Sequence, residues 1–89
     1  MRKYLAAAEA YLIEGSATSA IRCAHEARRQ TSSSQLQAQA DYLLGKAHLG
    51  QLKLTLAERY LEKSLTGMKG FRLEESRAHL VVCLRMQKK

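Results

Sequence analysis

Three histidines and two cysteines carry the most versatile side-chain chemistry in this sequence of 89 residues. His25, His48 and His79 fall on different predicted helices, and they do not form a metal-binding motif with one another. Cys23 and His25 are two residues apart, so on a helix they face different directions and cannot act as nucleophile and base. We therefore expect no metal site, no cofactor and no enzymatic activity.

The glycines and cysteines add no further chemical site. Gly67 and Gly70, on either side of Lys69, follow a predicted helix, whereas a phosphate-binding loop follows a strand. The only cysteines, Cys23 and Cys83, are far apart, and neither belongs to a C-x-x-C pair. We expect both thiols to be reduced and buried.

The composition predicts an all-α fold in a single small domain. The sequence has no proline and five glycines, and aromatic residues make up 6% although hydrophobic residues make up 46%. Alanine and leucine, both strong helix formers, must therefore fill the interior. No apolar run approaches the roughly 20 residues that cross a bilayer, and the N-terminal stretch is too short and too polar for a signal peptide. We expect an intracellular protein, cytoplasmic or nuclear, without membrane contact.

Apolar residues recur at helical spacing in five segments of the chain. In the third segment, for example, Ala40, Leu44 and Ala47 have the spacing i, i+4 and i+7. Gly15 ends the first segment, since glycine commonly stops a helix. The first four segments form two helical hairpins, and the fifth is a capping helix. The predicted bounds are about 2–30 for hairpin one, about 33–67 for hairpin two and about 71–87 for the capping helix.

Three local patterns predict helix ends. Ser32 with Gln35, and Thr55 with Glu58, have the form of capping boxes, so they predict the starts of the third and fourth helices. Gly50 stands where a left-handed residue would close the third helix.

The second hairpin repeats the first with a shift of 37 residues, the spacing between Thr18 and Thr55. The aligned pairs are Tyr4 and Asp41, Ala7 and Leu44, Ala8 and Gly45, Tyr11 and His48, Thr18 and Thr55, Ala20 and Ala57, Ala24 and Leu61, and Ala27 and Ser64. These positions, and above all the stretch ADYLLGKAHLGQLKLTLAERYLEKSL, resemble the tetratricopeptide repeat (TPR) family. Asp41 stands where that family has a large aromatic residue.

The resemblance implies a short TPR-like solenoid of antiparallel helical hairpins, about two repeats closed by the capping helix. Small residues would lie where the helices of a hairpin cross, so that the backbones approach within about 8–10 Å. In the second hairpin these residues are Gly45 and Ala57, and in the first they are Ala8 and Ala20.

The resemblance also implies a concave surface lined by the first helix of each hairpin. There we expect a scaffold or adaptor to bind a peptide, or an amphipathic helix with some acidic residues, of a partner protein. The expected contact residues are Leu5, Glu9, Leu12, Gln39, Tyr42, Leu43, Lys46 and Leu49. The family's carboxylate clamp is not expected, because Leu5, Glu9 and Leu43 replace its lysine and asparagines. An equally supported alternative is that Leu5, Leu43 and Leu49 are core residues and do not contact a partner.

The net charge of +7 keeps other functions open. A basic stripe on the second and fourth helices would suit a nucleic-acid-binding or regulatory domain, although Glu26 and Glu62 interrupt it. Its members are Arg22, Arg28, Arg29, Lys53, Arg59, Lys63, Lys69 and Arg72. Self-association through Leu80, Val81 and Leu84 is a third alternative. A further alternative is a plain five-helix bundle, in which the periodic alanines and leucines produce the apparent repeat by chance.

Overall fold

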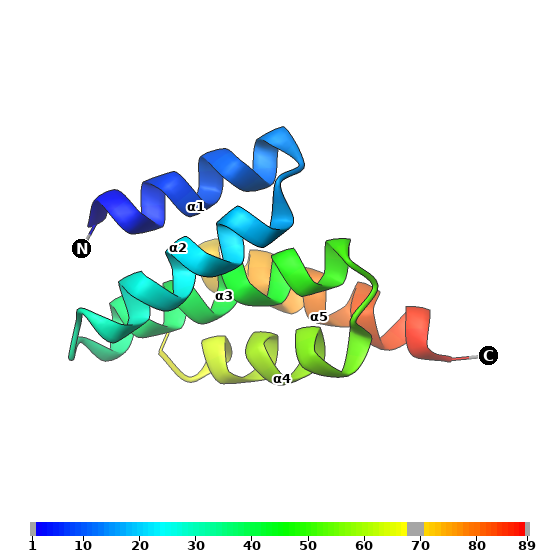
Figure 1. Cartoon of the computed structure of the whole chain (residues 1–89). Helices are drawn as coiled ribbons and strands as arrows, with labels where there is room; N and C mark the ends of the chain where they lie inside the picture. Colours follow the sequence, from blue (N-terminus) through cyan, green and yellow to red (C-terminus); the bar gives the residue numbers. More distant parts are fainter. Residues whose placement is uncertain (1, 68–70, 89) are drawn as a thin grey trace.

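The computed structural model describes residues 2–67 and 71–88. This part of the chain forms five α-helices and no strand, which confirms the all-α prediction. The helices are α1 (Arg2–Glu14), α2 (Ala17–Arg29), α3 (Ser34–Gly50), α4 (Leu54–Leu65) and α5 (Phe71–Gln87) (Figure 1). None of the described helices is long and apolar enough to cross a membrane.

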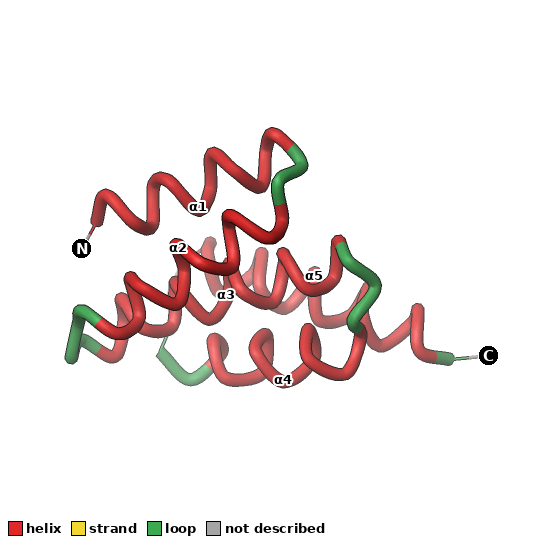
Figure 2. The backbone as a smooth tube through the Cα atoms, viewed as in Figure 1, coloured by secondary structure: helices red, strands yellow, loops and turns green. Residues whose placement is uncertain are grey.

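Helix α3 is the centre of the molecule, because it packs against each of the other four helices (Figure 1). Consecutive helices also pack in pairs, α1 with α2 and α4 with α5, and the loops between the first four helices are short (Figure 2). Nine residues of α3 between Ala38 and His48 are buried, more than on any other helix described. The core is therefore a layer of side chains around α3.

A residue without a side chain lets α3 and α4, the helices of the second hairpin, approach closely. A Cβ built on Gly45 would lie 2.6 Å from Cγ of Leu61, which comes from the facing helix α4. Ala8, Ala20 and Ala57 are all buried. Only a residue without a side chain fits at position 45 without displacing a neighbour.

The predicted helix ends are partly wrong. Gly15 does end α1, with the left-handed φ of +86° that favours glycine. The capping residue of α3 is Ser33 rather than Ser32, and its hydroxyl accepts a hydrogen bond from the backbone N–H of Leu36. At α4 the cap position is Lys53, without a side-chain hydrogen bond, so the predicted capping box there is absent.

The left-handed residue after α3 also differs from the prediction. Gly50 is the last residue of the helix, and Leu52 takes the positive φ of 62° instead. A leucine in this conformation carries backbone strain of about 1–2 kcal/mol. The turn is held by the backbone N–H of Lys53, which donates a hydrogen bond to the carbonyl of His48. Gly70, which follows the predicted fourth helix, lies outside the described residues.

Helix α5 is tied to α4 by buried polar contacts. The hydroxyls of Ser64 and Ser76, both buried, hydrogen-bond to each other. The thiol of Cys83 donates a hydrogen bond to the carbonyl of Leu54. Burial raises the pKa of this thiol, which keeps it protonated. The predicted capping helix therefore covers α4 with a specific, hydrogen-bonded face.

Candidate binding groove between helices α1 and α3

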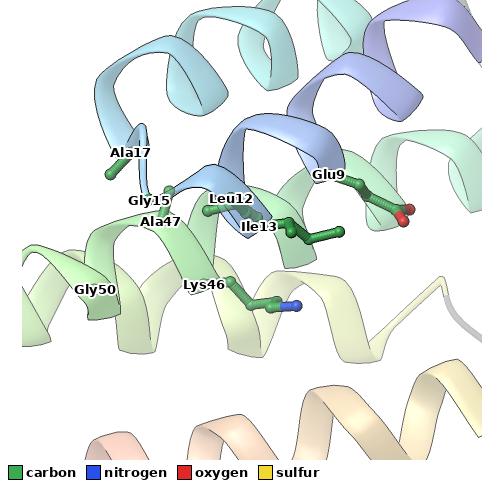
Figure 3. Close-up of a pocket in the computed structure, with 8 residues that line it drawn as sticks. All are labelled: Glu9, Leu12, Ile13, Gly15, Ala17, Lys46, Ala47 and Gly50. Carbon is green, nitrogen blue, oxygen red and sulfur yellow. The ribbon is translucent and has the colours of Figure 1, made fainter.

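Two depressions lie side by side along the α1 and α3 helices, and Glu9 lines both of them. The larger, of about 370 Å³, is lined by Glu9, Leu12, Ile13, Gly15, Ala17, Lys46, Ala47 and Gly50 (Figure 3). The smaller, of about 270 Å³, is lined by Leu5, Ala6, Glu9, Leu36 and Gln39. Together they form a groove, which we call the α1–α3 groove.

The rim of the groove carries one charge of each sign. Glu9 comes from α1 and Lys46 from α3, and Figure 3 shows both side chains extending to the same side of the groove. Ile13 lies one turn after Glu9 and extends to that side as well. It is 87% exposed, the most exposed large hydrophobic residue in the described part of the chain. An isoleucine this exposed between two opposite charges forms a small amphipathic surface.

The floor of the groove is apolar and belongs to the core. Ala47 is buried, Leu5 is buried, and Leu12 is partly buried against the core cluster. Because these positions are fixed by the packing of α1 on α3, the depression exists before anything binds. A preformed apolar pocket with a few polar groups at its edge is the usual form of a binding site.

Tyr42 explains how Lys46 is held at the rim. The ammonium nitrogen of Lys46 lies 5.3 Å from the centre of the Tyr42 ring, a cation–π distance. On its other sides the ring meets His79 edge-on at 5.6 Å, and its hydroxyl donates a hydrogen bond to Oε1 of Glu75 at 3.1 Å. Tyr42 therefore joins α3 to α5 and contacts Lys46, which lines the groove.

The eight contact residues expected from the sequence divide into two groups. Five line the groove, and these are Leu5, Glu9, Leu12, Gln39 and Lys46. Tyr42 and Leu43 are each 1% exposed and belong to the core, so a partner cannot touch them directly. Leu49 is partly buried against the core. Leu43 is therefore a core residue and not a contact residue. Leu5 belongs to the core and also forms part of the groove floor.

Sequence reasoning missed Ile13, the most exposed apolar side chain of the groove. Ile13 follows Glu9 by four residues, so the two lie on one face of α1. This spacing could have predicted Ile13 as a groove residue. Gly15, Ala17 and Gly50 were missed for another reason. They lie where the α1–α2 turn approaches the end of α3, and only the tertiary structure brings these segments together.

The predicted basic stripe is partly neutralised within the chain. Arg28 donates a hydrogen bond from Nε to Oδ1 of Asp41 at 2.9 Å, and Arg29 forms an ion pair with Glu26. Asp41 is buried, which raises its carboxyl pKa, although Arg28 opposes the shift. Lys69 and the side chain of Arg72 lie outside the described residues.

A second aromatic cluster lies on the α2 and α4 side of α3. Tyr60 stacks on His48 with ring centres 5.4 Å apart, and its edge meets His25 at 6.2 Å. Burial lowers the pKa of His48, helped by the charge of Lys53, and its Nδ1 has no hydrogen-bond partner in the described part of the chain. Among the described residues no group of three His, Cys, Asp or Glu side chains could hold a metal ion.

No family model, no curated protein and no solved structure matches this chain. The functional assignment therefore rests on the geometry of the α1–α3 groove.

Proposed function

We propose that this chain is a non-enzymatic protein-interaction module, a scaffold or adaptor of TPR-like architecture. It binds a peptide or an amphipathic helix of a partner protein in the α1–α3 groove. The observation that carries the proposal is the preformed groove, in which the exposed Ile13 stands with Glu9 and Lys46 above an apolar floor.

The helix contacts support the TPR-like part of the proposal. α1 packs against α3 and α3 packs against α5, so the first, third and fifth helices follow one another through the molecule. Each of α2 and α4 packs against the helix before it and the helix after it. This alternation is the neighbour pattern of stacked hairpins, in which each unit contacts only the next one. Gly45 lies against Leu61, so α3 and α4 cross closely, as the resemblance to TPR hairpins implies.

The groove specifies the chemistry of its partner. An aliphatic side chain fits the larger depression, whose volume of about 370 Å³ is at the small end of the range of about 300–1,000 Å³ for ligand pockets. Ile13 and Leu12 supply apolar contact, while Lys46 favours an acidic residue one turn away on a partner helix. The two rim charges set the orientation of the partner rather than most of its affinity.

The experiment that tests this function is a peptide selection followed by charge reversal at the rim. Purified chain is used to select binders from a displayed library of helical and extended peptides, and the affinity of each is measured for Lys46→Glu and Ile13→Asp. Each change should weaken binding by about tenfold or more, since it removes an apolar contact or reverses a rim charge. Arg59→Glu makes the same charge change on the exposed face of α4 and is the matched control.

Two results would sink the proposal. One is a set of selected peptides that bind Lys46→Glu and Ile13→Asp as tightly as the parent chain. The other is strong binding of an oligonucleotide whose affinity falls steeply as the salt concentration rises and is weakened by Arg59→Glu. This result would favour the nucleic-acid-binding alternative.

A further inference from the structure

The outer surface of α5 carries a stripe of four exposed residues that no other part of the described chain covers. Glu74, Ala78, Val81 and Arg85 have the spacing i, i+4, i+7 and i+11, so they lie along one face of the helix. We call them the α5 stripe. The opposite face of α5 carries Ser76 and Cys83, which are buried against α4.

Apolar residues lie all around the C-terminal half of α5 rather than on one side. Val81 and Val82 are each 46% exposed, and Leu84 and Met86 are exposed to a similar degree. Figure 1 shows this end of the helix reaching beyond its neighbours. A helix segment with apolar residues on most sides is typical of an interior or an interface rather than of a solvated surface. The outer face of α5 thus has the composition of an interface.

The α5 stripe is complementary to itself. If a second α5 helix lies antiparallel, with the midpoint between residues 78 and 81 on a two-fold axis, Glu74 of each copy faces Arg85 of the other. In the same alignment Ala78 of each copy faces Val81 of the other, so a small side chain meets a larger one. A two-fold interface requires a single patch that matches itself in this way.

We infer that two copies of this chain associate through antiparallel pairing of their α5 stripes. The sequence alone suggested Leu80, but Leu80 packs against the core, and the stripe replaces it. Among the described residues Glu74 pairs with Arg77, at 3.4 Å, with both side chains more than half exposed. An exposed pair of this kind is weak, so Glu74 can exchange it for Arg85 of the second copy.

The size of the contact makes the association weak and concentration-dependent. One pair of helices buries an area at the low end of specific interfaces, below about 1,200 Å². The net charge of +7 on each copy also opposes association, and the two Glu74–Arg85 contacts offset this repulsion locally. This pairing is independent of the α1–α3 groove, because no residue of the stripe lines that groove.

Charge reversal across the two-fold axis tests the pairing. Sedimentation velocity over a series of concentrations should show the parent chain in a monomer–dimer equilibrium. Glu74→Arg and Arg85→Glu should each weaken dimerisation by about tenfold or more, because each creates two contacts between like charges. An equal mixture of these two variants should recover the dimer, since every contact between a chain of one kind and a chain of the other joins opposite charges.

Matched variants control for net charge and folding. Glu62→Arg and Arg59→Glu make the same charge changes on exposed positions of α4, and they should leave dimerisation within about twofold of the parent. Circular dichroism should show unchanged helix content for all four variants, because the altered residues are exposed. Val81→Lys, also at an exposed position, should abolish the dimer without unfolding the chain.

Three results would overturn the inference. The parent chain could stay monomeric at every concentration, the single reversals could dimerise as the parent does, or the mixture could fail to recover the dimer. Peptide binding in the groove should be the same for Glu74→Arg as for the parent chain, so a failure of this inference leaves the proposed function standing.

Discussion

Gly45 of α3 lies so close to α4 that a Cβ at this position would sit 2.6 Å from Cγ and 2.8 Å from Cδ2 of Leu61. Leu61 is completely buried, so its side chain cannot move out into solvent without disturbing its neighbours. The missing side chain at position 45 therefore sets the distance between the two helices of the second hairpin.

Gly45→Ala should lower the free energy of unfolding by about 1–3 kcal/mol, because the added methyl group forces α3 and α4 apart. The measurement is chemical denaturation followed by circular dichroism. Gly50→Ala is the matched control, since nothing lies within 4 Å of a Cβ at that helix end. The control should leave stability unchanged or raise it by up to about 1 kcal/mol. Equal effects of the two changes would contradict the close approach of the helices.

Arg28→Met should destabilise the chain by about 1–3 kcal/mol, because it leaves the buried carboxylate of Asp41 without its cation. The partial exposure of Arg28 keeps the loss toward the lower end of this range. The double variant Arg28→Met/Asp41→Leu should recover most of the loss, since it removes the buried charge. A double-mutant cycle by urea denaturation measures this coupling, and additive losses would contradict it.

The pH dependence of Arg28→Met gives a second check. Burial raises the pKa of Asp41 above its ordinary value of 3.8, so the folded chain holds this proton more tightly than the unfolded chain. The cost of the buried carboxylate is therefore present above the folded-state pKa and disappears as the pH falls through it. The deficit of Arg28→Met relative to the parent should shrink on acidification. A deficit that grows at low pH would mean that Asp41 has no such role.

His48 should make the chain less stable in mild acid. Burial lowers the pKa of this imidazole below 6.5, so the unfolded chain binds a proton that the folded chain excludes. Stability is thus lost as the pH falls from 6.5 toward the folded-state pKa, by up to about 1.4 kcal/mol per pH unit. His48→Phe keeps a ring on Tyr60 and should flatten the decline between about pH 7.5 and about pH 5.5. An equally steep decline in the variant would exclude His48 as its cause.

The sequence predicted the five helices well because apolar spacing is a local property that packing then reinforces. It predicted the helix ends less well. Several serines in a row can each cap α3, and in the structure the cap is Ser33. At the next turn Leu52 takes a left-handed conformation that glycine would adopt more readily, and the local backbone hydrogen bond from Lys53 to His48 closes the turn there.

The residues that line the α1–α3 groove were predicted only in part. The TPR-like alignment named Glu9, Gln39 and Lys46, and the structure places these residues in the lining of the α1–α3 groove. It could not show that Tyr42 turns inward to meet α5, since that depends on Glu75 and the rest of a distant helix. Pairings across helices arise from the fold and have no signature in local spacing.

The most direct test of the proposed function is an NMR titration of isotope-labelled chain with the tightest peptide recovered by display. If the α1–α3 groove is the binding site, the largest amide shifts will fall on Glu9, Ile13, Lys46, Ala47 and Gly50, and the exposed faces of α2 and α4 will stay unchanged. Shifts centred on Arg22 and Arg59, with the groove unaffected, would contradict the account.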